Sequence, residues 1–373
     1  MRVVVAMSGG VDSSTVAALL AEQGHEVIGL AMKTHNLEPR ANRACCTPDD
    51  MRDARRVADL LDIPFYVLNY ADLFRETIIE PFARAYQAGR TPNPCVVCND
   101  KVKFEPLLKR AQLLGADRLA TGHYARISET QQGPQLRRAV DRRKDQSYFL
   151  YRLRSEQLQR LWFPLGSMTK DEVREHAERL GLSVAHKHES QEICFVGSEG
   201  YARTVETILG DELNKEGDIV HEDGRVLGRH RGIHHYTLGQ RRGLGLSHPE
   251  PLYVTDIDPS SNTVRVGPRA ALKTEEIWIE DAHWLGGVPA RDAELAVQQR
   301  YRERPKPVYV AEAGEGWARL RFASPENQGA PGQAAVIYDG DAVVGGGTVA
   351  RPPRRSSLRV LGQDAAGQQS AGA

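Results

Sequence analysis

The stretch that decides the fold lies near the amino terminus and reads Val3-Val4-Val5-Ala6-Met7-Ser8-Gly9-Gly10-Val11-Asp12-Ser13-Ser14. A short apolar run, two glycines and a helix-forming segment predict a strand, a tight turn and a helix. Glycines let a ligand approach the backbone, and the N-terminus of a helix attracts anions. No lysine follows the glycines, so the turn is not a Walker A loop. The stretch therefore predicts another kind of phosphate loop, at the carboxyl end of a first strand.

Strands alternate with helices through the first 200 residues. Apolar runs predict strands over Arg2–Ala6, Glu26–Met32 and Pro64–Leu68, and a fourth strand that ends at Leu119–Thr121. Helices are predicted over Ser13–Glu22 and Asp50–Leu61, and a third runs from the capping-box pair Thr169 and Glu172 to Leu180. This alternation predicts an α/β fold with a parallel sheet and helices on both faces.

The pattern changes to β-hairpins after about residue 210. Turn signals at Asp223–Gly224, Asp258–Asn262 and Asp339–Gly340 each separate two short apolar runs. We expect four parts: an α/β domain over residues 1–205, a central β-rich domain over 206–270, a C-terminal β-barrel over 271–352 and a disordered tail over 353–373.

The composition excludes several classes of protein. The chain has 373 residues with 49 basic and 49 acidic side chains, so any contact with nucleic acid must use local patches. Basic runs lie within residues 137–144, 229–242 and 300–306. No apolar run approaches the ~18 residues of a membrane span, and the amino terminus lacks the pattern of a signal peptide. These features favour a cytoplasmic protein without a membrane partner.

The cysteines indicate thiol chemistry. Cys95 and Cys98 form a CxxC pair, and Cys194 stands alone far along the chain. Sulfur transfer needs one thiol to carry a persulfide and a second to resolve it, which suits two distant cysteines. No second CxxC or CxxH is present to complete a zinc site, so we expect no metal there. Cys45 and Cys46 show no partner pattern and are expected to have a packing role.

Motifs along the chain resemble one family. The string SGGVDSS is similar to the pyrophosphate loop of the ATP-pyrophosphatase superfamily. Over residues 1 to about 350 the chain resembles the tRNA-specific 2-thiouridylase (MnmA) family, through the strings AMSGGVDSS, CCTPDD, TPNPCVVCN, TGHYAR, KDQSYFL, SQEICF, GLGLSHPEPLYV and PGQAAVIYDGD. The resemblance implies an N-terminal pyrophosphate-loop ATPase domain, similar to adenine nucleotide alpha hydrolases, followed by two small β-rich modules, the last a β-barrel.

The resemblance also implies a reaction. It is the ATP-dependent 2-thiolation of the wobble uridine, position 34, in the tRNAs for lysine, glutamate and glutamine. The uracil oxygen is adenylated with release of pyrophosphate, and sulfur from a cysteine persulfide then displaces AMP. The implied cofactors are ATP and Mg²⁺. The implied partners are the tRNA anticodon loop and a protein that donates persulfide sulfur.

Site residues follow by position within the matching motifs. Cys194 would carry the persulfide and Cys98 would act as the second nucleophile. The target base would contact Asn93, Pro94 and Cys95. ATP would bind Ala6, Met7, Ser8, Gly9, Gly10, Val11, Asp12, Ser13, Met32 and Gly122. The tRNA would bind His123, Lys144, Asp145, Gln146, Arg300, Tyr301 and Gln333.

Cys95 departs from the family pattern and leaves alternatives open. Many members have an aspartate at this position, proposed as a general acid/base. Either Cys95 takes over proton transfer, or Cys95, Cys98 and Cys194 hold a 4Fe-4S cluster that binds sulfide. An amidating synthetase of the same superfamily would not need the thiols. An RNA-binding protein without catalysis would not need the glycine loop.

Overall fold

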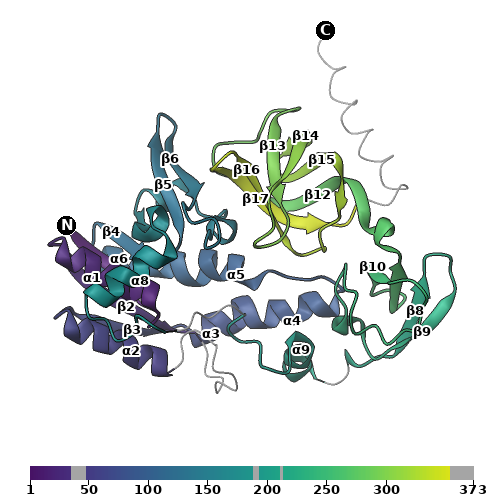
Figure 1. The fold of residues 1–373 in the computed structure, drawn as a ribbon, viewed down its shortest axis with the longest axis horizontal. Coiled ribbons are helices and arrows are strands. Elements are labelled where there is room, and N and C mark those ends of the chain that lie inside the picture. Colours follow the sequence, from purple (N-terminus) through teal and green to yellow (C-terminus); the bar gives the residue numbers. More distant parts are fainter. Residues whose placement is uncertain (35–47, 188–192, 211–212, 353–373) are drawn as a thin grey trace, which may run out of the picture.

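The computed structural model describes residues 1–34, 48–187, 193–210 and 213–352 (Figure 1). The expectations for Cys45, Cys46, residues 190–192 of the SQEICF motif and the tail 353–373 lie outside the described residues. In the described part of the chain, no helix is long and apolar enough to cross a membrane.

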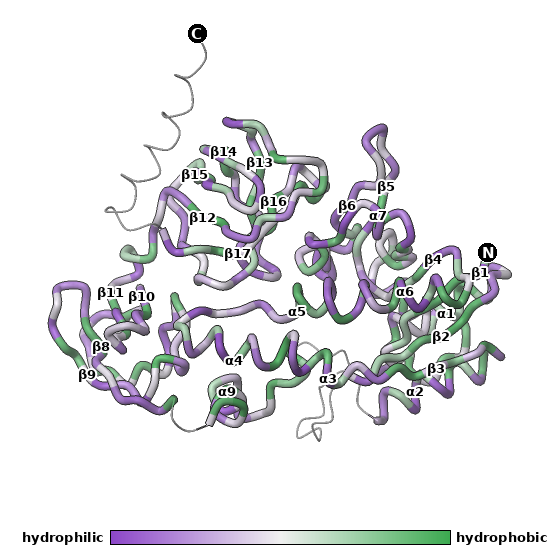
Figure 2. Tube along the Cα trace, turned by 180° about the vertical axis from the view of Figure 1, so that it is seen from behind, coloured by the Kyte–Doolittle hydropathy of each residue, from purple (hydrophilic) through white to green (hydrophobic). Residues whose placement is uncertain are grey.

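A parallel sheet forms the amino-terminal part, as predicted, and it has a fifth strand beyond the four that the sequence indicated. Its strand order is β3 (Phe65–Asn69), β2 (Glu26–Lys33), β1 (Arg2–Ala6), β4 (Arg118–Thr121) and β7 (Leu161–Trp162). All four neighbouring pairs are parallel. Figure 2 shows hydrophobic residues concentrated along β1 and β2, as expected for strands that are buried on both faces.

Each face of the sheet has its own apolar core. Val3 and Val5 of β1 pack into a cluster with residues of α1 (Val11–Glu22), α2 (Pro48–Leu60) and α8 (Lys170–Arg179). Val4, which points to the opposite face, packs into a second cluster with residues of α6 (Glu105–Leu113). The predicted capping box is confirmed, because the hydroxyl of Thr169 accepts from the backbone N–H of Glu172 and the Glu172 carboxylate accepts from the N–H of Thr169.

A run of short helices connects the parallel sheet to the rest of the molecule. It comprises α3 (Ala71–Phe74), a π-helical turn (Arg75–Ile79), α4 (Glu80–Gln87), α5 (Pro94–Val97) and a second π-helical turn (Cys98–Phe104) that leads into α6. In Figure 1, α4 extends away from the parallel sheet toward α9 (Tyr201–Leu209) and β10 (Tyr253–Asp258). A hairpin of β5 (Ala125–Thr130) and β6 (Gly133–Arg138), which the sequence patterns did not indicate, joins the barrel strand β17 at Arg137 and Ala342.

Two β-rich parts follow, as predicted. The first is a four-stranded sheet in the order β10, β11 (Thr263–Gly267), β8 (Gly217–His221) and β9 (Val226–His230). The second is a closed six-stranded barrel of β12 (Lys273–Trp284), β15 (Gly316–Asn327), β14 (Lys306–Gly314), β13 (Glu294–Gln298), β16 (Ala334–Asp339) and β17 (Ala342–Ala350), in that order. Pairing of β12 with β17 closes the barrel. The three predicted hairpin turns connect β8 to β9, β10 to β11 and β16 to β17.

Short elements complete the described fold. They are α7 (Ser155–Leu158) and the 3₁₀ turns Ser147–Phe149, Pro164–Ser167, Ile233–His235 and Arg269–Leu272.

Candidate active site

The glycine loop lies at the carboxyl end of β1 and folds back over the start of α1. The backbone N–H of Ser8 donates to the hydroxyl of Ser13 at 3.0 Å, and that hydroxyl donates to the carbonyl of Gly10 at 3.3 Å. Helix α1 begins at Val11, two residues earlier than predicted, because Gly10 rather than a serine takes the N-cap position. The loop therefore presents the positive end of the α1 dipole at the edge of the sheet where open α/β folds bind ligands.

Two glycines allow close backbone packing around this loop. Gly9 has a φ of +73°, and a Cβ atom there would lie 2.0 Å from the carbonyl oxygen of Asp50 at the start of α2. Gly122, which directly follows β4, would place a Cβ 2.8 Å from the backbone nitrogen of Ser13. The loop is thus enclosed between the start of α2 and the end of β4. The sheet order changes direction here, since β1 lies between β2 and β4.

Two lysines that sequence reasoning did not assign to the site lie at the loop. The ammonium of Lys170 donates to Oδ1 of Asp12 at 2.7 Å, and the hydroxyl of Tyr124 donates to the same oxygen at 2.7 Å. The ammonium of Lys187 donates to the carbonyl of Gly9 at 3.0 Å and to Asp50 at 2.7 Å. Both lysines form ion pairs beside the loop, Lys170 with Asp12 and Lys187 with Asp50 and Asp53.

The protonation of Lys187 is supported by its carboxylate partners. Burial alone lowers the pKa of a lysine, but hydrogen bonds to Asp50 and Asp53 outweigh burial and raise the pKa of Lys187. The sequence offers one signal that could have pointed to these two residues, namely the scarcity of lysine. Only ten of the 49 basic residues are lysines, and two of them, Lys170 and Lys187, lie here.

Met32 lies on β2, the strand next to β1, at the same carboxyl edge of the sheet. It lies near the carboxyl end of β2 and is buried, with 8% of its surface exposed. The backbone N–H of Met7 donates to the carbonyl of Leu30 at 2.8 Å, which fixes the start of the loop against β2. The structure thus places Met32 on β2 and Gly122 directly after β4, one on each side of the loop.

The barrel holds the segment that precedes the CxxC pair. The backbone N–H of Thr91 donates to the carbonyl of Pro331, and the side-chain amide of Gln333 donates to the carbonyl of Thr91 at 3.2 Å. Gly332 has a φ of +96°, and a Cβ atom there would lie only 3.0 Å from the carbonyl oxygen of Thr91. Asn93 then takes the N-cap position of α5, and Cys98 starts the π-helical turn. Irregular helical turns of this kind are frequent at functional sites.

The structure brings two distant cysteines against one apolar cluster. Cys95, Cys98 and Cys194 are thiols and all are partly exposed. Cys98 and Cys194 both pack against the cluster that contains Phe195. The Phe195 ring makes edge contacts with Phe74 at 5.8 Å and Phe82 at 5.0 Å between ring centroids. Phe195 therefore anchors the segment of Cys194 against α3 and α4, which precede the π-helical turn that begins at Cys98.

Most residues expected to bind tRNA lie where the barrel meets the KDQSYFL segment, residues 144–150. The Tyr301 ring packs on Phe149 with centroids 4.6 Å apart. The side chain of Gln146 accepts from the backbone N–H of Tyr124 at 2.9 Å. The carboxylate of Asp145 accepts from Arg138, from the hydroxyl of Ser147 and from two backbone N–H groups. Asp145 is therefore engaged within the protein, where it shapes the loop that carries Lys144 and Gln146.

His123 is a neutral ring. It lies within 5.4 Å of Phe104 and 6.0 Å of Phe163, and its Nδ1 lies 2.8 Å from the hydroxyl of Thr121. Burial, reinforced by the charge of Lys103, lowers the pKa of His123 to about 3. At neutral pH the ring therefore carries no charge and acts through stacking or hydrogen bonding.

This shift predicts a pH dependence of stability. Between pH 3 and the unfolded value of about 6.5, the unfolded state binds more protons, so the contribution is complete above about pH 6.5 and is lost as the pH falls. From about pH 7 to about pH 5.5, the wild type should lose about 1 kcal/mol more unfolding free energy than His123→Gln. Urea unfolding of both proteins at the two pH values measures this, and equal losses would refute it.

Sequence comparisons cover nearly the whole chain. Residues 1–198 match the tRNA methyl transferase HUP domain family, residues 204–268 the tRNA methyl transferase PRC-barrel domain and residues 274–349 the aminomethyltransferase β-barrel domain. A protein of Geotalea uraniireducens named tRNA-specific 2-thiouridylase MnmA is 49% identical over 355 residues, 93% of this chain and 94% of that relative. A protein of the same name from Geobacter metallireducens is 50% identical, over 93% of this chain and 96% of that relative.

Solved structures show a more distant likeness. The crystal structure of a 4-thiouridine synthetase–RNA complex with bound ATP aligns with a TM-score of 0.34 and 15% identity, over 52% of this chain and 44% of that one.

Proposed function

Because this chain belongs to the tRNA-specific 2-thiouridylase family, we propose that it transfers sulfur to carbon 2 of uridine 34 in the tRNAs for lysine, glutamate and glutamine. Members of this family are tRNA-uridine 2-sulfurtransferases. The observation that carries the proposal is the identity of about half of the residues over nearly the full length of both chains. The reaction takes place in the cytoplasm, and a persulfide-carrying protein supplies the sulfur.

The glycine loop binds the phosphates of ATP in the first half-reaction. Uracil oxygen O2 attacks the α-phosphorus, the bond to the β-phosphate oxygen breaks, and pyrophosphate leaves. The α1 dipole, Lys170 and Lys187 favour the anionic phosphates. Mg²⁺ accompanies ATP as its usual counterion. Oδ1 of Asp12 already accepts two hydrogen bonds, so Asp12 orients Lys170 and Tyr124 at the loop.

The thiols act in the second half-reaction. The terminal sulfur of a persulfide on Cys194 attacks carbon 2, and AMP leaves with the electrons of the carbon–oxygen bond. The thiolate of Cys98 then attacks Sγ of Cys194, the sulfur–sulfur bond breaks, and 2-thiouridine is released. The Cys98–Cys194 disulfide that forms is reduced by an external dithiol. Support comes from the apolar cluster against which both cysteines pack.

The target base is positioned by the segment that the barrel holds. Asn93, Pro94 and Cys95 contact the uracil, which must leave the anticodon stack to reach the adenylate. Residues that contact the rest of the anticodon arm are His123, Lys144, Gln146, Arg300, Tyr301 and Gln333. Asp145 acts on them indirectly, because its carboxylate is engaged within the protein.

Substitution of Cys95 separates the persulfide route from a 4Fe-4S route. Three thiols match the donor type of such a cluster, with Cys95 as one ligand. In the persulfide route, Cys95→Asp should keep activity within about tenfold of the wild type, because a carboxylate also moves protons. Iron and acid-labile sulfide, measured after anaerobic purification, provide the second readout. Stoichiometric iron that is lost in Cys95→Asp together with activity would refute the persulfide route.

Gln333 should affect base positioning more than adenylation. Gln333→Ala removes the hydrogen bond to the Thr91 carbonyl, worth about 1 kcal/mol, so thiolation should fall about 5- to 10-fold. Gln328→Ala is the matched control, because Gln328 donates instead to the carbonyl of Thr255 on β10, in the central β-rich part. Thiolation rates at saturating tRNA test this, and equal effects of the two substitutions would contradict it.

A reconstituted reaction tests the function as a whole. The full chain is mixed with a transcript of tRNA for lysine, ATP, Mg²⁺ and an inorganic polysulfide as the source of sulfane sulfur. Thiolated tRNA is detected by its retarded migration in a mercury-containing gel, and the modified nucleoside by mass spectrometry. We expect 2-thiouridine and AMP from this transcript and no product when uridine 34 is replaced by cytidine. Methyl incorporation from S-adenosylmethionine without thiolation would overturn the proposal.

A further inference from the structure

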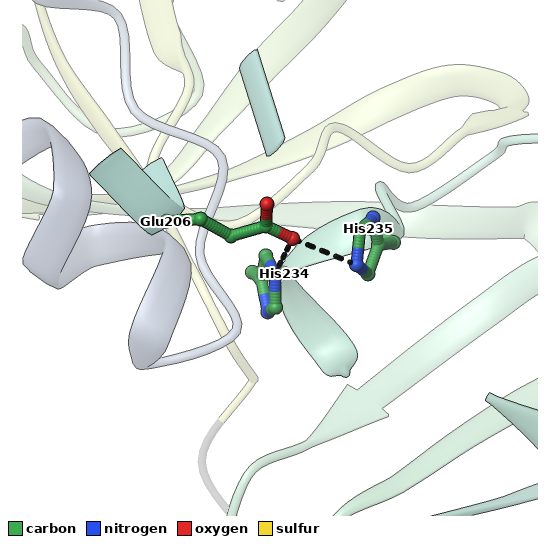
Figure 3. A group of neighbouring side chains, drawn as sticks. All are labelled: Glu206, His234 and His235. Carbon is green, nitrogen blue, oxygen red and sulfur yellow. Dashed lines mark hydrogen bonds and ion pairs between the residues drawn. The ribbon is translucent and has the colours of Figure 1, made fainter. Parts of the chain in front are cut away.

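Three potential metal ligands converge outside the proposed active site. Glu206 lies on α9, and His234 and His235 lie on the 3₁₀ turn between β9 and β10 (Figure 3). Nε2 of His234 is 3.3 Å and Nε2 of His235 is 3.4 Å from the same oxygen, Oε1 of Glu206. All three ligand atoms lie within 4.8 Å of one another, and no other group of three such residues in the described chain is this compact.

The two distances match the spacing of ligands around a zinc ion. Zinc binds imidazole nitrogen and carboxylate oxygen at about 2.0–2.1 Å in tetrahedral geometry. The ligand atoms at the corners of such a tetrahedron are then about 3.3–3.4 Å apart. The separations of both imidazoles from Glu206 fall in this range. Two histidines and one carboxylate also form a known protein ligand set for zinc, with water in the fourth position.

The surrounding contacts hold the three side chains in place. The guanidinium of Arg203 lies 3.1 Å from Oε2 of Glu206, which leaves Oε1 directed at the imidazoles. The hydroxyl of Tyr201 donates to the backbone carbonyl of His235 at 3.1 Å. Gly232 has no room for a Cβ atom, which would lie 2.5 Å from the His234 ring. The ligand positions are thus fixed by hydrogen bonds and packing.

Burial leaves one side of the cluster accessible. The side chain of His234 is 1% exposed and that of Glu206 is 9% exposed, whereas His235 is 24% exposed. A buried carboxylate requires a positive or hydrogen-bonding partner. An ion can reach the cluster past His235, the most exposed of the three side chains.

We propose that Glu206, His234 and His235 form a binding site for a divalent transition-metal ion, Zn²⁺. The carboxylate binds through Oε1 alone, and each imidazole binds through Nε2. The ion links α9 to the turn before β10. Tyr201 of α9 stacks on Tyr86 of α4, with ring centroids 4.7 Å apart. The bound ion would therefore stabilise the contact between the run of short helices and the central β-rich part. The competing explanation is a hydrogen-bonded His–Glu–His group that holds no metal.

Cobalt titration of the full chain tests the site. Co²⁺ replaces Zn²⁺ in such sites and gives visible d–d bands, and thiolate ligation adds a charge-transfer band in the near ultraviolet. After removal of bound metal with a chelator, we expect one equivalent of Co²⁺ with d–d bands and no thiolate band. His235→Gln should weaken binding by more than the about 10- to 100-fold typical of losing an outer-shell partner. Glu206→Gln should have a similar effect.

Controls separate ligand loss from misfolding and from binding at cysteines. His186→Gln removes a histidine whose side chain is 85% exposed and outside the cluster, and it should bind Co²⁺ as the wild type does. Thermal melting in the presence of chelator identifies variants that fold normally. Zn²⁺ should raise the melting temperature of the wild type and His186→Gln but not of correctly folded His235→Gln. Cobalt bound only through thiolates, or bound equally by the wild type and folded His235→Gln, would overturn the proposal.

Discussion

Replacing Cys194 by serine should reduce thiolation of tRNA by at least about 10³-fold, the scale of loss seen when a covalent nucleophile is removed. A serine hydroxyl cannot carry a sulfane sulfur, so the second half-reaction has no donor. The adenylation half does not use this thiol, and the glycine loop is unchanged. Release of pyrophosphate from ATP in the presence of tRNA should therefore persist, while the mercury-gel shift of the product disappears.

Two other cysteines supply the matched control for Cys194→Ser. Cys45→Ser and Cys46→Ser should leave thiolation nearly intact, because their sequence context carries no partner for sulfur transfer. A loss in either control comparable to that in Cys194→Ser would show that the working thiols are assigned wrongly. Loss of pyrophosphate release in Cys194→Ser would show that this residue also serves the first half-reaction.

Gly9→Ala should strongly impair the use of ATP and destabilise the fold. The φ of +73° alone costs an alanine about 1–2 kcal/mol, and the new Cβ would lie 2.0 Å from the Asp50 carbonyl oxygen. That neighbour is backbone and cannot move aside as a flexible side chain does, which adds about 1–3 kcal/mol of overpacking. Relief of the overlap must separate the loop from α2 and disturb the hydrogen bonds of Lys187 to Gly9 and Asp50.

Gly24→Ala is the control for the backbone conformation alone. Gly24 has a φ of +77°, but nothing lies within 4 Å of its Cβ position. It should lower the unfolding free energy by only about 1–2 kcal/mol and leave AMP formation unchanged. Gly9→Ala should lower AMP formation by at least about 100-fold, as a displaced binding group does. AMP assays and urea unfolding of both variants measure this, and indistinguishable variants would contradict the close-packing argument.

Local sequence patterns predicted many of the strands, helices and turns, but they could not predict contacts between residues far apart in the chain. The strand β1, the capping box at Thr169 and the hairpin turns depend on residues that are neighbours in sequence, so they were predictable. The contact of Lys187 with Asp50 joins residues 137 positions apart, and no periodicity indicates such a partner. The β5–β6 hairpin was missed because its strands alternate weakly and include Pro134.

In the candidate site, too, some residues could be predicted from local sequence and others could not. The glycine loop could be predicted because tight turns and helix N-termini have a local sequence signature. The residues expected to contact tRNA came from family resemblance alone, since a lone histidine or tyrosine carries no such signature. Asp145 illustrates the limit, because only the folded structure shows its carboxylate accepting from Arg138 and Ser147.

The hydrogen bond from Gln333 to Thr91 has a consequence for the newly made protein. The two residues are 242 positions apart in the chain. A ribosome adds about 5–20 residues per second, so Gln333 is synthesised roughly 10–50 s after Thr91. During that interval the segment with Cys95 and Cys98 lacks its anchor in the barrel. A nascent chain that already carries the complete glycine loop therefore holds its CxxC segment without this anchor until translation has reached β16.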